Sequence, residues 1–292
     1  MRYKITFSYE GTNFLGYQRQ PGEGRTVQGE IEEALRILYK EEVEIHASGR
    51  TDKGVHARGQ VAHFDLNLCL EPDKICYALN RFLGRDIRLH QAEIVDEAFH
   101  ARKSALGKHY SYKMYLGKQP PAIGYATFCP IFTTFSPEIF FLSLLPLLGR
   151  HNFQGFCGRG SSVKTYERTI YAIALEVEGD WLTLHLVGDG FLRKMIRNIV
   201  GTALDMIFNR RQKEALLTCL TERDRTKGGQ TAPSEGLVLE EVFYTKADLL
   251  AKMKFLETLT YYQGDGKTSE KVTTKAENGS LYINESSFFI NI

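Results

Sequence analysis

Paired cysteines are missing from this sequence. The five cysteines stand at positions 69, 76, 129, 157 and 219, and none of them belongs to a CxxC pair. Zinc ribbons and disulfide frameworks both need cysteines that can pair in space, so an odd number without close spacing fits neither class. A reduced cytosol is the simplest environment for such thiols, and we expect a cytoplasmic protein.

A long apolar run is also absent. The longest apolar-rich stretch, residues 139–148, is interrupted by Ser143 and Pro146, whereas a membrane-spanning helix needs about 20 residues. The first residues alternate polar and apolar side chains, which is not the continuous apolar core of a secretion signal. We therefore expect no membrane partner.

The chain has little net charge. Its 37 Lys and Arg residues against 35 Asp and Glu leave a formal charge of +2. A nucleic-acid binder of this balance must gather its cations on one surface. Residues 100–118 contain five cations, several tyrosines and no acid, and such a mixture suits phosphate contact and base stacking. Cations also cluster at residues 150–168 and on the expected helix at 193–197. Taken together, the three clusters fit RNA binding and solvated strand and helix faces about equally well.

What is present is the composition of a globular chain. The 292 residues are 43% hydrophobic and 25% charged, and a chain this long accommodates two domains of about 150 residues each. From Tyr3 to Tyr9 apolar and polar residues alternate, which predicts a strand. The elements expected in the first half are strands at 3–9, 42–47, 59–65, 87–95 and 107–116, helices at 27–40 and 72–83, and a loop at 48–58.

The second half predicts a similar mixture. A connector rich in proline and glycine comes first, and the expected elements that follow are a helix at 136–148, a hairpin of 169–178 and 181–187, an amphipathic helix at 191–208, a strand at 236–244 and a helix at 246–263. The order β-α-β-β-α-β recurs in small RNA-binding sheets. We predict an α/β (α+β) fold of two ferredoxin- or RRM-like halves, each a mainly antiparallel sheet flanked by helices, with a cleft between them.

The segment Ser48–Gln60 carries the clearest chemistry. It reads SGRTDKGVHARGQ and joins two expected strands, so its single carboxylate, Asp52, lies among Arg50, Lys53 and Arg58. Nearby cations keep a carboxylate ionised, which suits a nucleophile or an electrostatic stabiliser better than a general acid. A tight turn with a hydrogen-bonded aspartate and solvated cations explains the same residues.

Residues 49–57, GRTDKGVHA, resemble the signature of the tRNA pseudouridine synthases of the TruA type. Other segments resemble further motifs of that family in the same order, and the resemblance covers about residues 1–244: FHARKSA at 99–105, YSY at 110–112, HNF at 151–153, SSVKT at 161–165, GFLRKMIRNIVG at 190–201, and AP with GL at 232–237. The sequence departs from the family at Lys108, where arginine is common, and in the residues that follow Tyr244.

The resemblance implies an activity, the isomerisation of uridine to pseudouridine in the anticodon stem-loop of tRNA at positions 38 to 40. It implies tRNA as the partner, a homodimer, no cofactor and no catalytic metal. It also assigns residues: Asp52 as the catalytic nucleophile, Tyr110 as the contact to the target base, and Arg197 as the partner of the aspartate.

The chemistry makes these roles sensible. An ionised carboxylate either attacks the anomeric carbon or assists departure of the base by a related route that ends in elimination. An arginine fork keeps that carboxylate charged and aimed, and an aromatic ring holds the detached uracil. We expect Arg50, Lys53 and Arg58 to bind substrate, the two arginines by filling the space of the extruded base or by gripping its phosphate.

Two rival functions remain open on the sequence. One is a non-catalytic protein that binds structured RNA with the same basic and aromatic face. The other is a glycoside-cleaving hydrolase, although it needs a second carboxylate that the loop lacks. The expected domains are a catalytic half at 1–117, a connector at 118–135, a half that completes the cleft at 136–245, and an extension of unknown role at 246–292.

Overall fold

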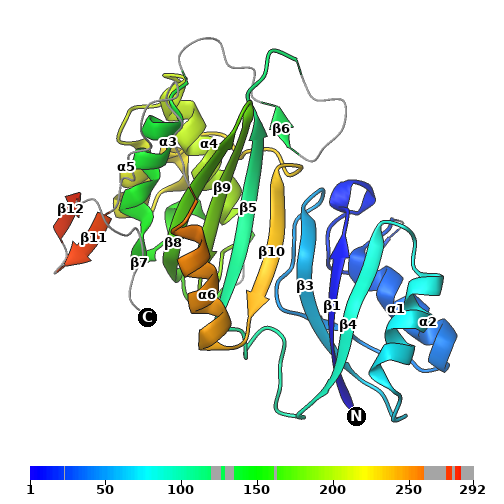
Figure 1. Ribbon diagram of the computed structural model, residues 1–292. Coiled ribbons are helices and arrows are strands. Elements are labelled where there is room, and N and C mark those ends of the chain that lie inside the picture. The colour runs from blue at the N-terminus through cyan, green and yellow to red at the C-terminus, as the bar shows by residue number, and fades with distance from the viewer. Residues whose placement is uncertain are drawn as a thin grey trace. The chain divides into compact units, whose positions relative to one another are not determined.

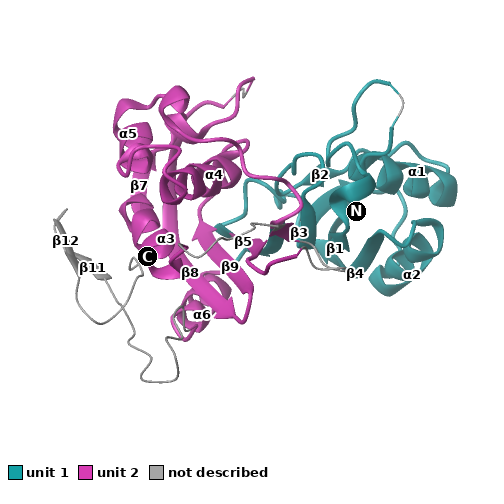
Figure 2. Cartoon of the chain, turned by 90° about the horizontal axis from the view of Figure 1, so that it is seen from above, with its two compact units in different colours: residues 1–108, 238–244 teal, residues 109–237, 245–292 magenta. Residues whose placement is uncertain are grey.

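The chain forms two compact units in a computed structural model that describes residues 1–22, 24–119, 126–128, 135–160, 163–259, 274–277 and 280–283. Unit 1 comprises residues 1–108 and 238–244, and unit 2 comprises residues 109–237 and 245–292 (Figure 2). The chain therefore leaves unit 1 once and returns to it for a single late segment. Each unit is described here by itself.

Four strands lie side by side in unit 1 in the order β4 (Ile87–Val95), β1 (Arg2–Tyr9), β3 (His56–Asp65) and β10 (Leu237–Phe243) (Figure 1). β1 is antiparallel to both β3 and β4, while β10 is parallel to β3. The short strand β2 (His46–Ala47) pairs antiparallel with β3. The predicted alternation in the first strand is confirmed, because alternate residues from Tyr3 to Tyr9 are buried.

Two helices complete unit 1. In α1 (Val27–Tyr39) the Thr26 side chain accepts a hydrogen bond from Gly29 N and caps the first turn, as predicted. Its buried face includes Ile31 and Leu35, and the helix ends where Lys40 turns left-handed. α2 (Pro72–Phe82) begins with its proline, whose missing N–H costs nothing in a first turn. α1 contacts α2, and α2 contacts β4.

Unit 2 contains a second set of strands in the order β5 (Gly107–Tyr115), β9 (Trp181–Gly188), β8 (Glu167–Glu178) and β7 (Gly149–Asn152), with β6 (Thr127–Phe128) parallel to β5. The predicted hairpin is confirmed: β8 and β9 pair antiparallel across a turn in which Gly179 has a φ of 56°. A glycine takes this left-handed conformation without steric cost.

The helices of unit 2 are α3 (Pro137–Leu144), α4 (Met195–Ile207), α5 (Ala215–Glu222) and α6 (Lys246–Leu256). α4 contacts α3 and α5, and α6 contacts β8. In both views α6 lies on the opposite side of β8 and β9 from α4 (Figures 1 and 2). The short 3₁₀ segments and the last strand pair are η1 (Gly11–Asn13), η2 (Leu145–Leu147), η3 (Gln154–Phe156), η4 (Arg225–Lys227), β11 (Thr274–Glu277) and β12 (Ser280–Ile283).

The predicted fold class is confirmed: the chain is mixed α/β, with mainly antiparallel strands flanked by helices. Several boundaries were wrong. The predicted strand at 42–47 pairs only over its last two residues, the helix expected at 191–208 begins at Met195, and the helix expected at 246–263 ends at Leu256. Most of the expected connector lies outside the described residues. No helix in the described ranges has both the length and the apolar character to cross a membrane.

Candidate active site

The segment between β2 and β3 folds into a tight turn around Asp52. Ser48 N donates to Val61 O at 2.7 Å where the segment leaves β2, and Val55 N donates to Asp52 O at 3.1 Å. Gly54 within this turn has a φ of 78°, which favours glycine. The predicted loop is therefore confirmed from Ser48 to Val55, and it presents a half-buried aspartate.

Two other backbone segments lie directly against this turn, and both need glycine to do so. A Cβ on Gly11 would lie 2.1 Å from Val55 O, and a Cβ on Gly16, which has a φ of 114°, would lie 3.1 Å from Thr51 O. Tyr17 N donates to the same Thr51 O at 3.1 Å. The peptide groups beside Asp52 are thus supported by backbone, which cannot rotate away as a side chain can.

A buried hydroxyl also supports the turn. Tyr9 OH and Thr51 Oγ1 share a hydrogen bond of 2.8 Å. Gln60 Nε2 donates to Tyr9 OH at 3.3 Å and to Gly49 O at 2.8 Å. Burial raises the pKa of Tyr9 to about 12, while its hydrogen bonds with Thr51 and Gln60 act in the opposite direction. The hydroxyl therefore stays protonated at neutral pH.

The cations around the turn differ in their surroundings. Arg50 and Lys53 are exposed. Arg58, on β3, is also exposed, and its Nη1 lies 3.3 Å from a carboxylate oxygen of Glu240 on β10. Lys108 Nζ donates to Ser48 O at 2.6 Å at the base of the turn. Arg58 is thus engaged by an acid, whereas Lys108 has a supporting contact that its position in the sequence did not indicate.

Tyr110, the predicted contact to the target base, lies on β5 in unit 2. Only 7% of its surface is exposed, and its ring meets the Phe191 ring edge-to-face, with centroids 5.2 Å apart and planes at 80°. Edge-to-face packing of this kind fixes a ring orientation. Tyr110 is therefore a largely buried ring held in one orientation.

Arg197, the predicted partner of the aspartate, lies on α4, also in unit 2. Its Nε donates to Ala232 O at 2.7 Å, and Ala232 N donates to Arg197 O at 3.0 Å. The same strip of chain lies so close to α4 that a Cβ on Gly201 would be 1.8 Å from Gln230 O. The half-buried arginine is consequently held at its base, and its position depends on this contact with residues 230–232.

The structure gathers Asp52, Arg50 and Lys53 in one turn of unit 1, with Arg58 following on β3, and it assigns Tyr110 and Arg197 to unit 2. The sequence reasoning missed the residues that support the turn. Gln60 offered one signal, because an amide in the middle of an apolar strand needs a buried partner. Tyr9 gave no such signal, since it continued an apolar alternation.

Two buried histidines of β3 accept hydrogen bonds from backbone N–H groups. His56 Nδ1 accepts from Gly11 N at 3.1 Å, and His63 Nδ1 accepts from Ala101 N at 3.2 Å. Burial, followed by the neighbouring His100 and His46, lowers the pKa of His63 to about 4. Within the ranges that the structure describes, no group of three or more His, Cys, Asp or Glu residues is arranged to hold a metal ion.

Comparison with known proteins supplies the family. The model of the tRNA pseudouridine synthase family matches residues 5–102 and 146–245. A tRNA pseudouridine synthase A of Bacillus subtilis (strain 168) is 41% identical over 246 residues, which are 84% of this chain and 99% of that protein. One of Bacillus pumilus (strain SAFR-032) is 42% identical, with the same coverage.

A solved structure of a Cbf5-Nop10-Gar1 complex aligns with 66% of this chain and 52% of that chain at 15% identity, and its TM-score of 0.29 is too low to support an argument. The sequence matches do not depend on it. They span both units and include the residues of the Asp52 turn, so the resemblance of the signature is confirmed. The chain belongs to the tRNA pseudouridine synthase family, and its activity is that of an isomerase.

Proposed function

We propose that this enzyme converts uridine to pseudouridine in the anticodon stem-loop of tRNA, at positions 38 to 40, with Asp52 as the nucleophile. The observation that carries the proposal is the turn itself. Gly16 and Gln60 support its backbone and Tyr9 binds the Thr51 side chain, so the segment that carries Asp52 is held in place. Its residues also match the family signature.

The reaction breaks the bond between uracil N1 and the ribose C1′ and forms a bond between C5 and C1′. The C5 proton is lost and N1 gains a proton, so no electrons enter or leave. Asp52 in its ionised form attacks C1′, or acts as a base in the route that passes through elimination. Both routes need a charged carboxylate held beside the sugar.

Residues of both units take part in this proposal. Arg197 keeps Asp52 ionised and oriented through its guanidinium group. In this proposal Tyr110 holds the detached uracil by ring contact, and its phenol helps to move the C5 proton. The rigid packing of Tyr110 on Phe191 supports such a role, because a platform that rotates loses the base.

The exposed cations hold the RNA. A uridine inside a stem is out of reach until it is extruded, at a cost of a few kcal/mol. Arg50 and Arg58 fill the vacated space or grip the phosphate, and Lys53 adds a further phosphate contact. The same proposal includes a cytoplasmic location, which a tRNA substrate indicates, and a homodimer, which the family resemblance indicates.

Release of tritium tests the catalytic role. We expect wild-type enzyme to release tritium from tRNA labelled at uridine C5, and Asp52→Asn to release none while it still binds tRNA. Asp73→Asn, a change at an exposed aspartate in the first turn of α2, serves as the matched control and keeps full activity. Release by Asp52→Asn at a wild-type rate rules out the nucleophile.

The position is tested with substrates that each retain one uridine. Transfer RNAs in which only position 38, 39 or 40 carries uridine are incubated with enzyme, and pseudouridine is mapped in each. We expect modification at these positions and at no uridine outside the anticodon stem-loop. Pseudouridine confined to another stem contradicts the proposed site, although not the family.

A further inference from the structure

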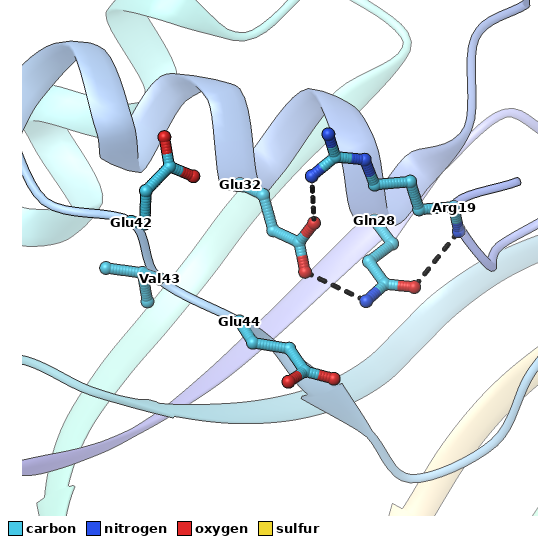
Figure 3. Close-up of a pocket in the computed structure, with 6 residues that line it drawn as sticks. All are labelled: Arg19, Gln28, Glu32, Glu42, Val43 and Glu44. Carbon is cyan, nitrogen blue, oxygen red and sulfur yellow. Dashed lines mark hydrogen bonds and ion pairs between the residues drawn. The ribbon is translucent and has the colours of Figure 1, made fainter. Parts of the chain in front are cut away.

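A buried carboxylate on α1 connects the segments that support the Asp52 turn. Glu32 is only 8% exposed, and glutamate is seldom buried unless it is paired. It faces a pocket of about 350 Å³ lined by Arg19, Gln28, Glu32, Glu42, Val43 and Glu44. Glu32 Oε1 accepts from Gln28 Nε2 at 2.8 Å, and Glu32 Oε2 lies 3.5 Å from Arg19 Nη1 (Figure 3).

Gln28, which binds Glu32, also binds the loop that precedes α1. Its side-chain Oε1 accepts from Arg19 N at 3.0 Å, and its backbone N donates to Tyr17 O at 2.9 Å. One glutamine therefore holds residues 17–19 at two points, and Figure 3 shows its side chain between Arg19 and Glu32. The Gln28 amide nitrogen donates to Glu32 Oε1 at 2.8 Å and, over a longer distance of 3.4 Å, to Ile45 O, so Glu32 is the nearer of the two acceptors that orient it.

The loop held by Gln28 is the one that lies against the catalytic turn. Tyr17 N donates to Thr51 O, and Gly16 lies so close that a Cβ there would be 3.3 Å from Lys53 N and 3.4 Å from Asp52 C. A shift of residues 16–17 consequently moves the peptide groups on both sides of Asp52.

Glu32 also holds the chain that leads into the turn. Its Oε1 accepts from Ile45 N at 3.1 Å, and Ile45 directly precedes β2, which runs into Ser48 and the turn. The same carboxylate oxygen thus receives hydrogen bonds from both supports, one through Gln28 and one from the backbone. The buried oxygen fixes the distance between them.

We propose that Glu32, acting through Gln28, is a positioning residue for the Asp52 turn. It touches neither substrate nor reacting atoms; it fixes the two backbone segments between which the catalytic carboxylate is held. This inference rests on the proposed role of Asp52. Since the isomerisation needs the carboxylate at C1′ within a fraction of an ångström, loosening the supports reduces the rate of the chemical step and leaves tRNA binding intact.

Substitutions on one helix turn test the inference. Glu32→Leu removes the acceptor, Glu32→Gln keeps an Oε1 that accepts from both Gln28 and Ile45, and Glu33→Leu alters the adjacent glutamate, which pairs with Arg36 on the exposed face of α1. In single-turnover assays with saturating enzyme we expect the rate of Glu32→Leu to fall by about 10- to 100-fold. Its Kd for tRNA stays within about twofold, and Glu32→Gln and Glu33→Leu stay within about threefold in rate.

If Glu32 only stabilises the fold, a Glu32→Leu enzyme that is folded reacts at the wild-type single-turnover rate. That result overturns the proposal, and so does a Glu32→Gln enzyme that is as slow as Glu32→Leu. If Glu32→Leu does not fold, Gln28→Ala replaces it, because this change leaves the bond between Glu32 and Ile45 in place; the same loss of rate with unchanged tRNA affinity is expected, and its absence is equally decisive.

Failure of the proposed catalytic role gives a separate result. Should Asp52→Asn remain active, the nucleophile assignment fails whatever the Glu32 variants do. Should Asp52→Asn be inactive while Glu32→Leu and Gln28→Ala react at the wild-type rate, only the positioning role fails. Hydrogen exchange of residues 48–55 adds a direct readout, because we expect faster exchange in Glu32→Leu and no change in Glu33→Leu.

Discussion

Replacing Tyr9 by phenylalanine tests a support of the Asp52 turn that does not involve Glu32. The change removes one hydroxyl that is shared with Thr51 Oγ1 at 2.8 Å and receives Gln60 Nε2 at 3.3 Å. Gln60 keeps its bond to Gly49 O, so the unsatisfied group is the Thr51 hydroxyl. Leaving one buried polar group without its partner costs about 1–3 kcal/mol of unfolding free energy.

The pH dependence of that cost follows from the raised pKa of Tyr9. Burial raises it to about 12 from 10.0 in an unfolded chain. The stabilisation is therefore complete below pH 10 and is lost as the pH rises toward 12, because the unfolded chain then releases the phenol proton more readily. By pH 11.5 this linkage removes about 2 kcal/mol from the wild-type protein and nothing from Tyr9→Phe.

Urea unfolding at pH 7, 9, 10.5 and 11.5 measures the effect. We expect wild type to exceed Tyr9→Phe by about 1–3 kcal/mol at pH 7 and 9, and the difference to shrink by about 2 kcal/mol at pH 11.5. The internal control is that the difference between wild type and Tyr9→Phe is the same at pH 7 as at pH 9. A difference that stays constant or grows above pH 10 refutes the claim that burial of this hydroxyl controls its ionisation.

Three further changes have defined outcomes. Arg58→Ala removes an exposed pair with Glu240, so we expect less than about 1 kcal/mol of lost stability in denaturant titration, whereas the slope of log affinity for tRNA against log salt decreases by about 1. Gly16→Ala adds a Cβ at a φ of 114° and 3.1 Å from Thr51 O; a cost of about 1–3 kcal/mol and a slower single-turnover rate are expected, and an unchanged melting temperature contradicts this. His63, whose pKa is lowered to about 4, makes the wild-type protein lose stability as the pH falls from 6.5 to 4, and a His63→Gln variant measured over the same range shows a smaller loss.

The alternation of apolar and polar residues predicted strands correctly where backbone hydrogen bonds between strands are regular. It failed where a backbone N–H bonds to a side chain and not to a neighbouring strand. The first strand is the success, since all four of its inward residues are buried in the sheet. Residues 42–47 are the failure: Val43 and Ile45 are buried as a strand pattern demands, yet Ile45 N donates to the Glu32 carboxylate and not to a neighbouring strand. A contact between residues 13 positions apart is not visible in local periodicity.

Helix boundaries failed for a backbone reason. The amphipathic pattern from Phe191 continues into α4, but Lys194 adopts a φ of 59°, and a left-handed residue stops the helix from extending backward. The signature turn, in contrast, was located correctly because its glycines and charges are contiguous. Its supports were not, since Tyr9, Gln60 and Lys108 come from three separate strands and converge only in the folded unit.

The late return of the chain to unit 1 has a consequence for biosynthesis. β3 begins directly after the Asp52 turn and pairs with β10, whose residues 238–244 are made after the whole of residues 109–237. While residues 109–237 are being synthesised, unit 1 therefore lacks its last strand, and the backbone groups of β3 that pair with β10 stay unpaired, which promotes aggregation. Nascent chains halted before residue 238 are expected to engage chaperones, and the enzyme becomes competent only when translation has passed residue 244.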